Sequence, residues 1–155
     1  ALHPAEDRTL VHLELIDSAI EASYVTLSAD GFSLRPGIKD AVARGFLEVD
    51  EPFVILGVAP LMHQSGVELE VDRVRPFSET CLAQVVHWEF YNHLRLFQYL
   101  TPPPEVFPGD RLDIECRYET LHRIEPTRQG QDASNEQCLA RLYTVPAGSG
   151  TGSEP

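Results

Sequence analysis

The chain has little positive charge. Its 155 residues include 12 Lys and Arg against 24 Asp and Glu, which gives a formal net charge of −12. Lys39 is the only lysine, and the arginines are scattered along the sequence. Nucleic acids and anionic membrane surfaces attract clustered cations, so we exclude both as partners. No apolar run approaches the ~20 residues of a membrane-spanning helix, and the first residues do not read as a signal peptide.

Several catalytic motifs are also missing. The sequence has no Gly-rich phosphate loop, no CxxC pair, no GxSxG elbow and no HExxH motif. Its six histidines are spread over the chain, so a metal site would have to be assembled in space. The three cysteines, Cys81, Cys116 and Cys138, allow one disulfide with one cysteine left over. Their number alone does not identify the redox compartment.

What the sequence has is an alternation of apolar and polar residues with period two. Val67–Val74 reads VELEVDRV and Leu112–Thr120 reads LDIECRYET, each with apolar residues on one face. This pattern is typical of antiparallel strands with one face in water. We predict further strands at Leu10–Asp17, Tyr24–Leu27, Gly45–Val49, Phe53–Val58, Cys81–Phe90, Leu94–Leu100 and Leu139–Val145.

Turn residues separate these segments. Phe107-Pro108-Gly109-Asp110 suits a type II turn, and a helical turn is indicated only at Asp40–Gly45. Eight or nine short strands with regular turns predict an all-β, antiparallel, jelly-roll-like β-sandwich. We expect residues 1–20 to form an N-terminal strand or linker, 21–146 the sandwich, and 147–155 a flexible tail.

Several segments follow one another in an informative order. His87-Trp88-Glu89-Phe90 is an aromatic–acidic–Phe strand, Phe107–Asp110 contains PGD, and Ile114–Thr120 contains C-x-Y-x-T. Further on, Ser134–Cys138 is similar to a D/E-E-M-C segment, and Leu142–Pro146 to the Tyr-rich strand after it. In this order they resemble the C-terminal half of the copper type II, ascorbate-dependent monooxygenases, the group of dopamine β-monooxygenase and peptidylglycine α-hydroxylating monooxygenase. The resemblance covers roughly residues 8–146.

The resemblance implies a disulfide between Cys116 and Cys138, since the family pairs the cysteines of these two motifs. Such a bridge implies an oxidising compartment, extracellular or in the lumen of the secretory pathway. The alternative is two reduced, buried thiols in a cytosolic protein. Cys81 has no counterpart in this pattern, and is either a buried free thiol or the partner of a segment outside this chain.

The resemblance also implies a copper site with the ligand set H-x-H-x-x-G plus the methionine of E-E-M-C. In this chain Leu61 occupies the first ligand position, His63 the second, and Gln137 replaces the methionine. Gly66 matches the motif, whereas Met62 would point to the opposite face of an extended strand. An amide is a harder and weaker donor than a thioether. His63 is therefore the one candidate metal ligand of the set, and a polar residue at a sheet edge is the alternative interpretation.

The family's second copper is bound by histidines of a preceding domain, and the last of these aligns with Ile16 here. We therefore expect a degenerate domain without a catalytic residue and without a cofactor. It would serve as a structural or protein-interaction module that contacts a protein partner or neighbouring domains of a larger secreted or lumenal protein.

Two alternatives stay open. The first is an active copper- and ascorbate-dependent monooxygenase domain that hydroxylates a C–H bond. The second is a carbohydrate- or peptide-binding sandwich that uses the aromatic residues between Trp88 and Tyr99, although aromatic residues more often pack in a core. The acidic residues Glu68, Glu70 and Asp72 suggest either a Ca²⁺ site or a solvated strand face.

Overall fold

The computed structural model describes residues 10, 12, 21–91 and 97–148. Within these residues the regular structure is built from β-strands, and every pair of named strands is antiparallel. The described part of the chain contains no helix with the length and apolarity to cross a bilayer. The predicted all-β, antiparallel sandwich is confirmed.

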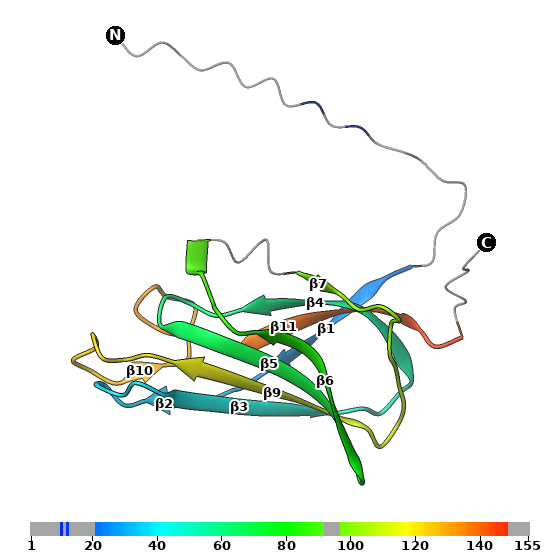
Figure 1. The fold of residues 1–155 in the computed structure, drawn as a ribbon, viewed down its shortest axis with the longest axis horizontal. Helices are drawn as coiled ribbons and strands as arrows, with labels where there is room; N and C mark the ends of the chain where they lie inside the picture. The colour runs from blue at the N-terminus through cyan, green and yellow to red at the C-terminus, as the bar shows by residue number, and fades with distance from the viewer. Residues whose placement is uncertain (1–9, 11, 13–20, 92–96, 149–155) are drawn as a thin grey trace.

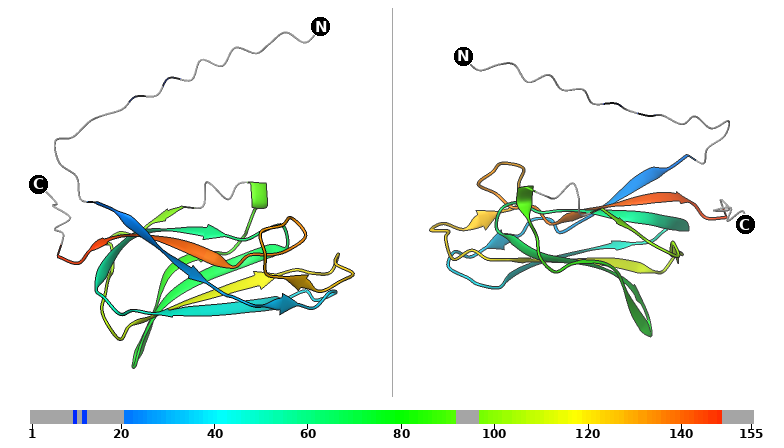
Figure 2. Two further views of the ribbon diagram at one scale, coloured as in Figure 1. Left: turned by 180° about the vertical axis from the view of Figure 1, so that it is seen from behind. Right: turned by 45° about the horizontal axis from the view of Figure 1, so that its top comes forward.

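Two sheets form the layers of the sandwich (Figures 1 and 2). The first has the order β1–β11–β4–β7, and β8 also pairs with β4. Its strands are β1 (Ser23–Ser28), β4 (Phe53–Leu61), β7 (Gln98–Tyr99), β8 (Glu105–Val106) and β11 (Leu139–Pro146). The second has the order β3–β9–β5–β6. Its strands are β3 (Ala41–Glu48), β5 (Gly66–Arg75), β6 (Ser78–Val85) and β9 (Arg111–Tyr118). The short strands β2 (Ser33–Leu34) and β10 (Thr127–Arg128) pair with each other.

The core lies between the two sheets and follows the alternation in the sequence. In β9, Leu112, Ile114, Cys116 and Tyr118 are buried, while the charged residues between them are only partly buried. Ile55, Val58 and Leu142 face them from the first sheet. Removing such apolar surface from water is the main favourable contribution to folding, and period-two alternation supplies one buried face per strand.

The disulfide between Cys116 and Cys138 is confirmed, with a Cα–Cα distance of 5.8 Å. Cys116 belongs to β9 of the second sheet, and Cys138 directly precedes β11 of the first. The bridge therefore joins the two layers next to the Ser134–Cys138 segment. Cys81 is a free cysteine in this chain and is exposed, so of its two alternatives the buried free thiol was wrong.

The helical turn predicted at Asp40–Gly45 was also wrong. Ala41–Glu48 forms β3, which pairs with β9 along its whole length, from Ala41 opposite Tyr118 to Glu48 opposite Arg111. Ala41 and Ala43 are buried beneath this pairing. Alanine favours a helix by local propensity, but cross-strand pairing and burial decide the conformation here.

Other strand boundaries shift. The strand predicted at Cys81–Phe90 is β6, which begins and ends earlier than predicted. Of the strand predicted at Leu94–Leu100, only Gln98–Tyr99 is assigned as a strand, and residues 94–96 lie outside the described residues. The predicted Leu10–Asp17 strand also lies outside them, apart from Leu10 and His12. The described strands run from Ser23 to Pro146, while the boundaries at residues 20 and 146 stay predictions.

The turn at Phe107–Asp110 forms as predicted. The backbone N–H of Asp110 donates to the carbonyl of Phe107 at 2.9 Å, and Gly109 has a φ of 92°, a value that favours glycine. The buried Asp110 carboxylate accepts two hydrogen bonds from the Arg75 guanidinium, at 2.6 and 2.7 Å. These bonds lower the pKa of Asp110. The turn is thereby attached to the β5–β6 hairpin.

Candidate functional site

The residues aligned with the family's copper ligands lie at the end of β4 and in the loop that leads to β5. Leu61 and His63 are each half-buried, whereas Met62 between them is completely buried in the core. Met62 therefore faces into the core, whereas Leu61 only packs against its margin and His63 stays half-buried beside it. The inference that Met62 cannot join His63 as a ligand agrees with this arrangement.

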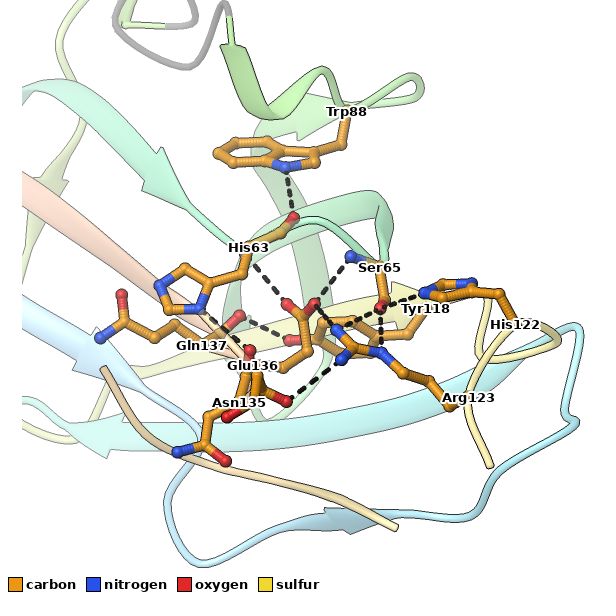
Figure 3. A network of polar contacts seen from close by, with 10 residues as sticks. His63, Ser65, Trp88, Tyr118, His122, Arg123, Asn135, Glu136 and Gln137 are labelled. Carbon is orange, nitrogen blue, oxygen red and sulfur yellow. Dashed lines mark hydrogen bonds and ion pairs between the residues drawn. The ribbon is translucent and has the colours of Figure 1, made fainter. Parts of the chain in front are cut away.

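A buried carboxylate holds this loop in place (Figure 3). Glu136, whose side chain is completely buried, accepts hydrogen bonds from the backbone N–H groups of His63 at 2.9 Å and of Ser65 at 2.7 Å. The guanidinium of Arg123 lies 3.7 Å from the same carboxylate and also donates to the Ser65 hydroxyl. A buried charge needs such partners, and here all of them come from other segments of the chain.

The ring of His63 is fixed in one orientation. Its Nδ1 lies 3.0 Å from the carbonyl oxygen of Asn135. A carbonyl can only accept, so Nδ1 carries a proton, and in the neutral imidazole Nε2 has the lone pair. The indole N–H of Trp88 donates to the His63 carbonyl at 2.9 Å. An imidazole held in this way is suitable as a metal ligand through Nε2.

Gly66 completes the loop through close packing. A Cβ atom at this position would lie 2.9 Å from the Cβ of Met62 and 3.0 Å from Cδ1 of Trp88. The first contact is shorter than real Cβ atoms make and the second is very tight, so the passage between the core and Trp88 favours glycine. The Gly66 identity in the aligned motif is thus explained by packing, independently of any metal.

The other two ligand positions do not fit copper. Leu61 has no donor atom and lies opposite Leu139 of β11. Gln137 offers an amide, and its side chain extends to the same side as the His63 ring (Figure 3). One imidazole and one amide do not supply the two imidazoles and the thioether of the family set, and soft Cu(I) binds an amide weakly. The donor set in this chain does not fit the metal.

Leu61 instead borders an apolar groove of about 320 Å³ on the outer surface of the first sheet. The groove is lined by Ala59, Pro60, Leu61, Phe97, Leu139, Arg141 and Tyr143. Arg141 lies over the ring of Tyr24, 5.5 Å from its centroid. Within the described chain Arg141 has no carboxylate partner. The surface beside His63 is therefore mainly apolar, with one guanidinium.

The other histidines that the structure describes are His12, His87 and His122. His87 is exposed and lies 3.8 Å from Glu89. His122 is exposed, and its Nε2 lies 3.5 Å from the Ser65 hydroxyl. His93 and Ile16 lie outside the described residues, and His12, which is described, is exposed.

Trp88 is not a surface platform. Only 5% of its surface is exposed, and its indole is bonded to the loop backbone. A sugar-binding role for Trp88 would require an exposed ring face, so this part of the carbohydrate-binding alternative was wrong. Tyr91 and Tyr99 are exposed, but they do not form a platform with Trp88.

The sequence did not indicate the role of Glu136. It stands beside Gln137 in the segment that resembles E-E-M-C, and in the sequence it is one of many acidic residues. The only hint in the sequence was its position directly before Gln137 and the disulfide cysteine Cys138. Nothing in the sequence pointed to Ser65 and Arg123. They meet only because the fold brings together two segments that are 58 positions apart.

Comparison with known proteins shows which family the chain belongs to. Residues 43–147 match the family model of the copper type II ascorbate-dependent monooxygenase C-terminal domain. DBH-like monooxygenase protein 1 of Gallus gallus is 41% identical over 125 residues, which is 74% of this chain and 20% of that protein. The Homo sapiens protein of the same name is 32% identical over 102 residues, 64% of this chain and 16% of that protein.

Putative DBH-like monooxygenase protein 2 of Homo sapiens is 33% identical over 85 residues, which is 54% of this chain and 17% of that protein. The chain thus spans about a fifth, or less, of the length of these curated relatives. The matched family model covers more than half of the chain, and it includes the disulfide and the loop around His63. The chain therefore belongs to the copper type II ascorbate-dependent monooxygenase family and carries its C-terminal domain.

Proposed function

We propose that this domain binds no copper at the position of the family site and serves as a structural and protein-interaction module within a longer protein. The observation that carries the proposal is Leu61. It stands where the first imidazole is required, and its side chain borders an apolar groove. A single imidazole with an amide neighbour does not retain Cu(I) against competing ligands.

The scaffold around the loop supports an interaction role. Glu136, Trp88 and the disulfide hold the loop rigidly, although the ligand set is incomplete. A rigid surface with an apolar groove loses little conformational entropy on binding a protein partner. The disulfide favours a secreted or lumenal location, since such bonds persist in oxidising compartments.

The alternative is an active domain that hydroxylates a C–H bond with copper and ascorbate. It is favoured by the Nε2 lone pair of His63 and by the monooxygenase names of the relatives. In that case a longer form of the protein would supply the further ligands.

Anaerobic titration with Cu(I) in the presence of a chromophoric competitor tests the proposal. We expect the wild-type chain to bind no more copper than His63→Ala. Stoichiometric binding that depends on His63 would refute the proposal and favour the alternative. Ascorbate-dependent oxygen uptake by the longer protein would then measure the activity directly.

A further inference from the structure

Strand β6 lies at the edge of the second sheet. It pairs with β5, and no other strand of the described chain pairs with its second edge. The β5–β6 hairpin projects beyond the rest of the sandwich at its tip (Figures 1 and 2), where Phe77 is fully exposed. On the free side of β6, the Gln98 amide donates to the Gln84 carbonyl at 2.7 Å. An unpaired edge of this kind is a template for an added strand.

The outer face beside this edge is acidic. In β5, Glu70 and Asp72 point outward, and Cys81 of β6 lies opposite Asp72 with Glu79 two residues before it. Ligand atoms of Glu70, Asp72 and Cys81 lie within 4.8 Å of one another. Neither Glu70, Asp72 nor Glu79 forms an ion pair with a cation of the described chain.

The neighbouring carboxylates on β9 differ in this respect. Asp113 is held by Arg111 at 2.7 Å, and Glu115 by Arg44 and Arg117 at 2.7 and 2.8 Å. Arg111 also interacts with Glu79 at longer range, but its close partner is Asp113, so the acids beside the β6 edge have no cation of the described chain in direct contact. Burial, and then repulsion from Glu70, Glu79 and Asp113, raises the pKa of Asp72 to about 6.

The other side of the edge is different. A groove of about 380 Å³ runs between β6 and the segment that follows residue 97. Its lining is mixed: Leu82, Tyr99, Leu100, Pro102 and Pro104 supply apolar and aromatic surface, and polar residues lie between them. Arg73 also lines the groove, where its guanidinium donates to the carbonyl of Glu105. A strand added to β6 would thus meet acidic groups on one face and apolar groups on the other.

We propose that the free edge of β6 binds an extended segment of a protein partner in which Lys or Arg alternates with apolar residues. Successive side chains of a strand point to opposite faces, so the basic residues would reach Glu70, Asp72 and Glu79 while the apolar ones enter the groove. Backbone hydrogen bonds to β6 supply part of the affinity, and charge complementarity selects the partner.

A second copy of this chain fits the edge poorly. Pairing β6 with another β6 would bring Glu79 and the neighbouring carboxylates of both copies together, and like charges on adjacent strands are destabilising. Copper binding at His63 has no bearing on this proposal, because His63 follows a strand of the other sheet.

The test uses a fluorescent, acetylated and amidated peptide in which lysine alternates with valine, and a chain with Cys81→Ser, so that the exposed thiol cannot link two copies while the Cys116–Cys138 disulfide stays intact. Fluorescence anisotropy is expected to show binding that weakens as salt concentration rises. Two control peptides are expected not to bind. In one, glutamate replaces lysine; in the other, the backbone N–H groups that would bond to β6 are methylated.

The double variant Asp72→Asn, Glu79→Gln is expected to bind the lysine peptide roughly tenfold more weakly, because two charge contacts are lost. The matched control Glu125→Gln, Asp132→Asn removes two exposed acids elsewhere and is expected to bind like the wild type. Equal binding of the N-methylated peptide, or of one with all lysines in a single block, would overturn strand addition. Absence of binding, or self-association of the free chain through β6, would overturn the proposed partner.

Discussion

The buried carboxylate of Glu136 accepts a hydrogen bond from the backbone amide of Ser65 at 2.7 Å, across 71 positions of the sequence. With the parallel bond to the amide of His63, it attaches the β4–β5 loop to the segment before β11. Both donors belong to the stretch that aligns with the family's copper motif. The shape of this stretch therefore depends on Glu136.

Replacement of Glu136 is expected to destabilise the domain. Glu136→Ala leaves two buried amide donors without an acceptor, which costs about 2–4 kcal/mol in the free energy of unfolding. Glu136→Gln keeps one carbonyl acceptor and is expected to lose less. Urea denaturation followed by Trp88 fluorescence measures both, because the indole lies against this loop. Glu125→Gln, an exposed change, is the control, and an unchanged midpoint for Glu136→Ala would contradict this account.

Removal of the disulfide is expected to cost about 3 kcal/mol, the chain-entropy estimate for a loop of this length. The double variant Cys116→Ser, Cys138→Ser removes the bond that joins the two sheets; the two cysteines are 22 positions apart in the sequence. Thermal and urea unfolding of this variant and of Cys81→Ser give the comparison. Cys81 is exposed, so its replacement is expected to change stability by less than about 0.5 kcal/mol. A larger effect of Cys81→Ser would show a structural role for that thiol.

The elevated pKa of Asp72 predicts a pH dependence of stability. Its folded-state pKa is about 6, above the ordinary value of 3.8, so the folded state holds the proton more tightly than the unfolded state. Stability is therefore lost as the pH rises from about 4 through about 6. Asp72→Asn is expected to stabilise the chain at pH 7–8 by about 1 kcal/mol, after allowance for solvent screening of a partly buried group.

At pH 4 the Asp72→Asn variant and the wild type are expected to have similar unfolding free energies, because the carboxyl is then protonated in the folded state. Urea midpoints measured across this pH range isolate the contribution of Asp72. Asp132→Asn provides the exposed control. A variant that is equally stabilised at pH 4 and pH 8 would show that ionisation of Asp72, disfavoured first by burial and then by its acidic neighbours, is not the cause.

Restoring the missing ligands is expected to create a copper site. Leu61→His and Gln137→Met together would give the loop two outward-facing imidazoles and a thioether, while Glu136 and Trp88 keep it in place. The double variant is expected to bind one equivalent of Cu(I) in the competition assay, at least tenfold more tightly than the wild type, as each added ligand contributes. Adding His63→Ala to it serves as the control, since it removes one of the three donors. Unchanged copper affinity would indicate that the surrounding scaffold has also diverged.

The clean alternation in β5 and β9 allowed the sequence to predict these strands, their buried faces and the sandwich. Alternation with period two places every second residue of a strand in the core, whichever strands it pairs with. For β3 the predicted strand at Gly45–Val49 covered only the second half, because Ala41 and Ala43 in the first half are helix-favouring residues that become buried strand residues only when paired with β9.

The sequence by itself determined the identity of the donor atoms. Leu61 has none and Gln137 has only an amide, so the incomplete ligand set follows from side-chain chemistry alone. Tertiary structure decided how His63 is held, through Glu136, Asn135 and Trp88, and which acidic residues lack a partner. The reason is physical: hydrogen bonds and charge compensation depend on distances between segments far apart in the chain, and alternation within one strand carries no record of those distances.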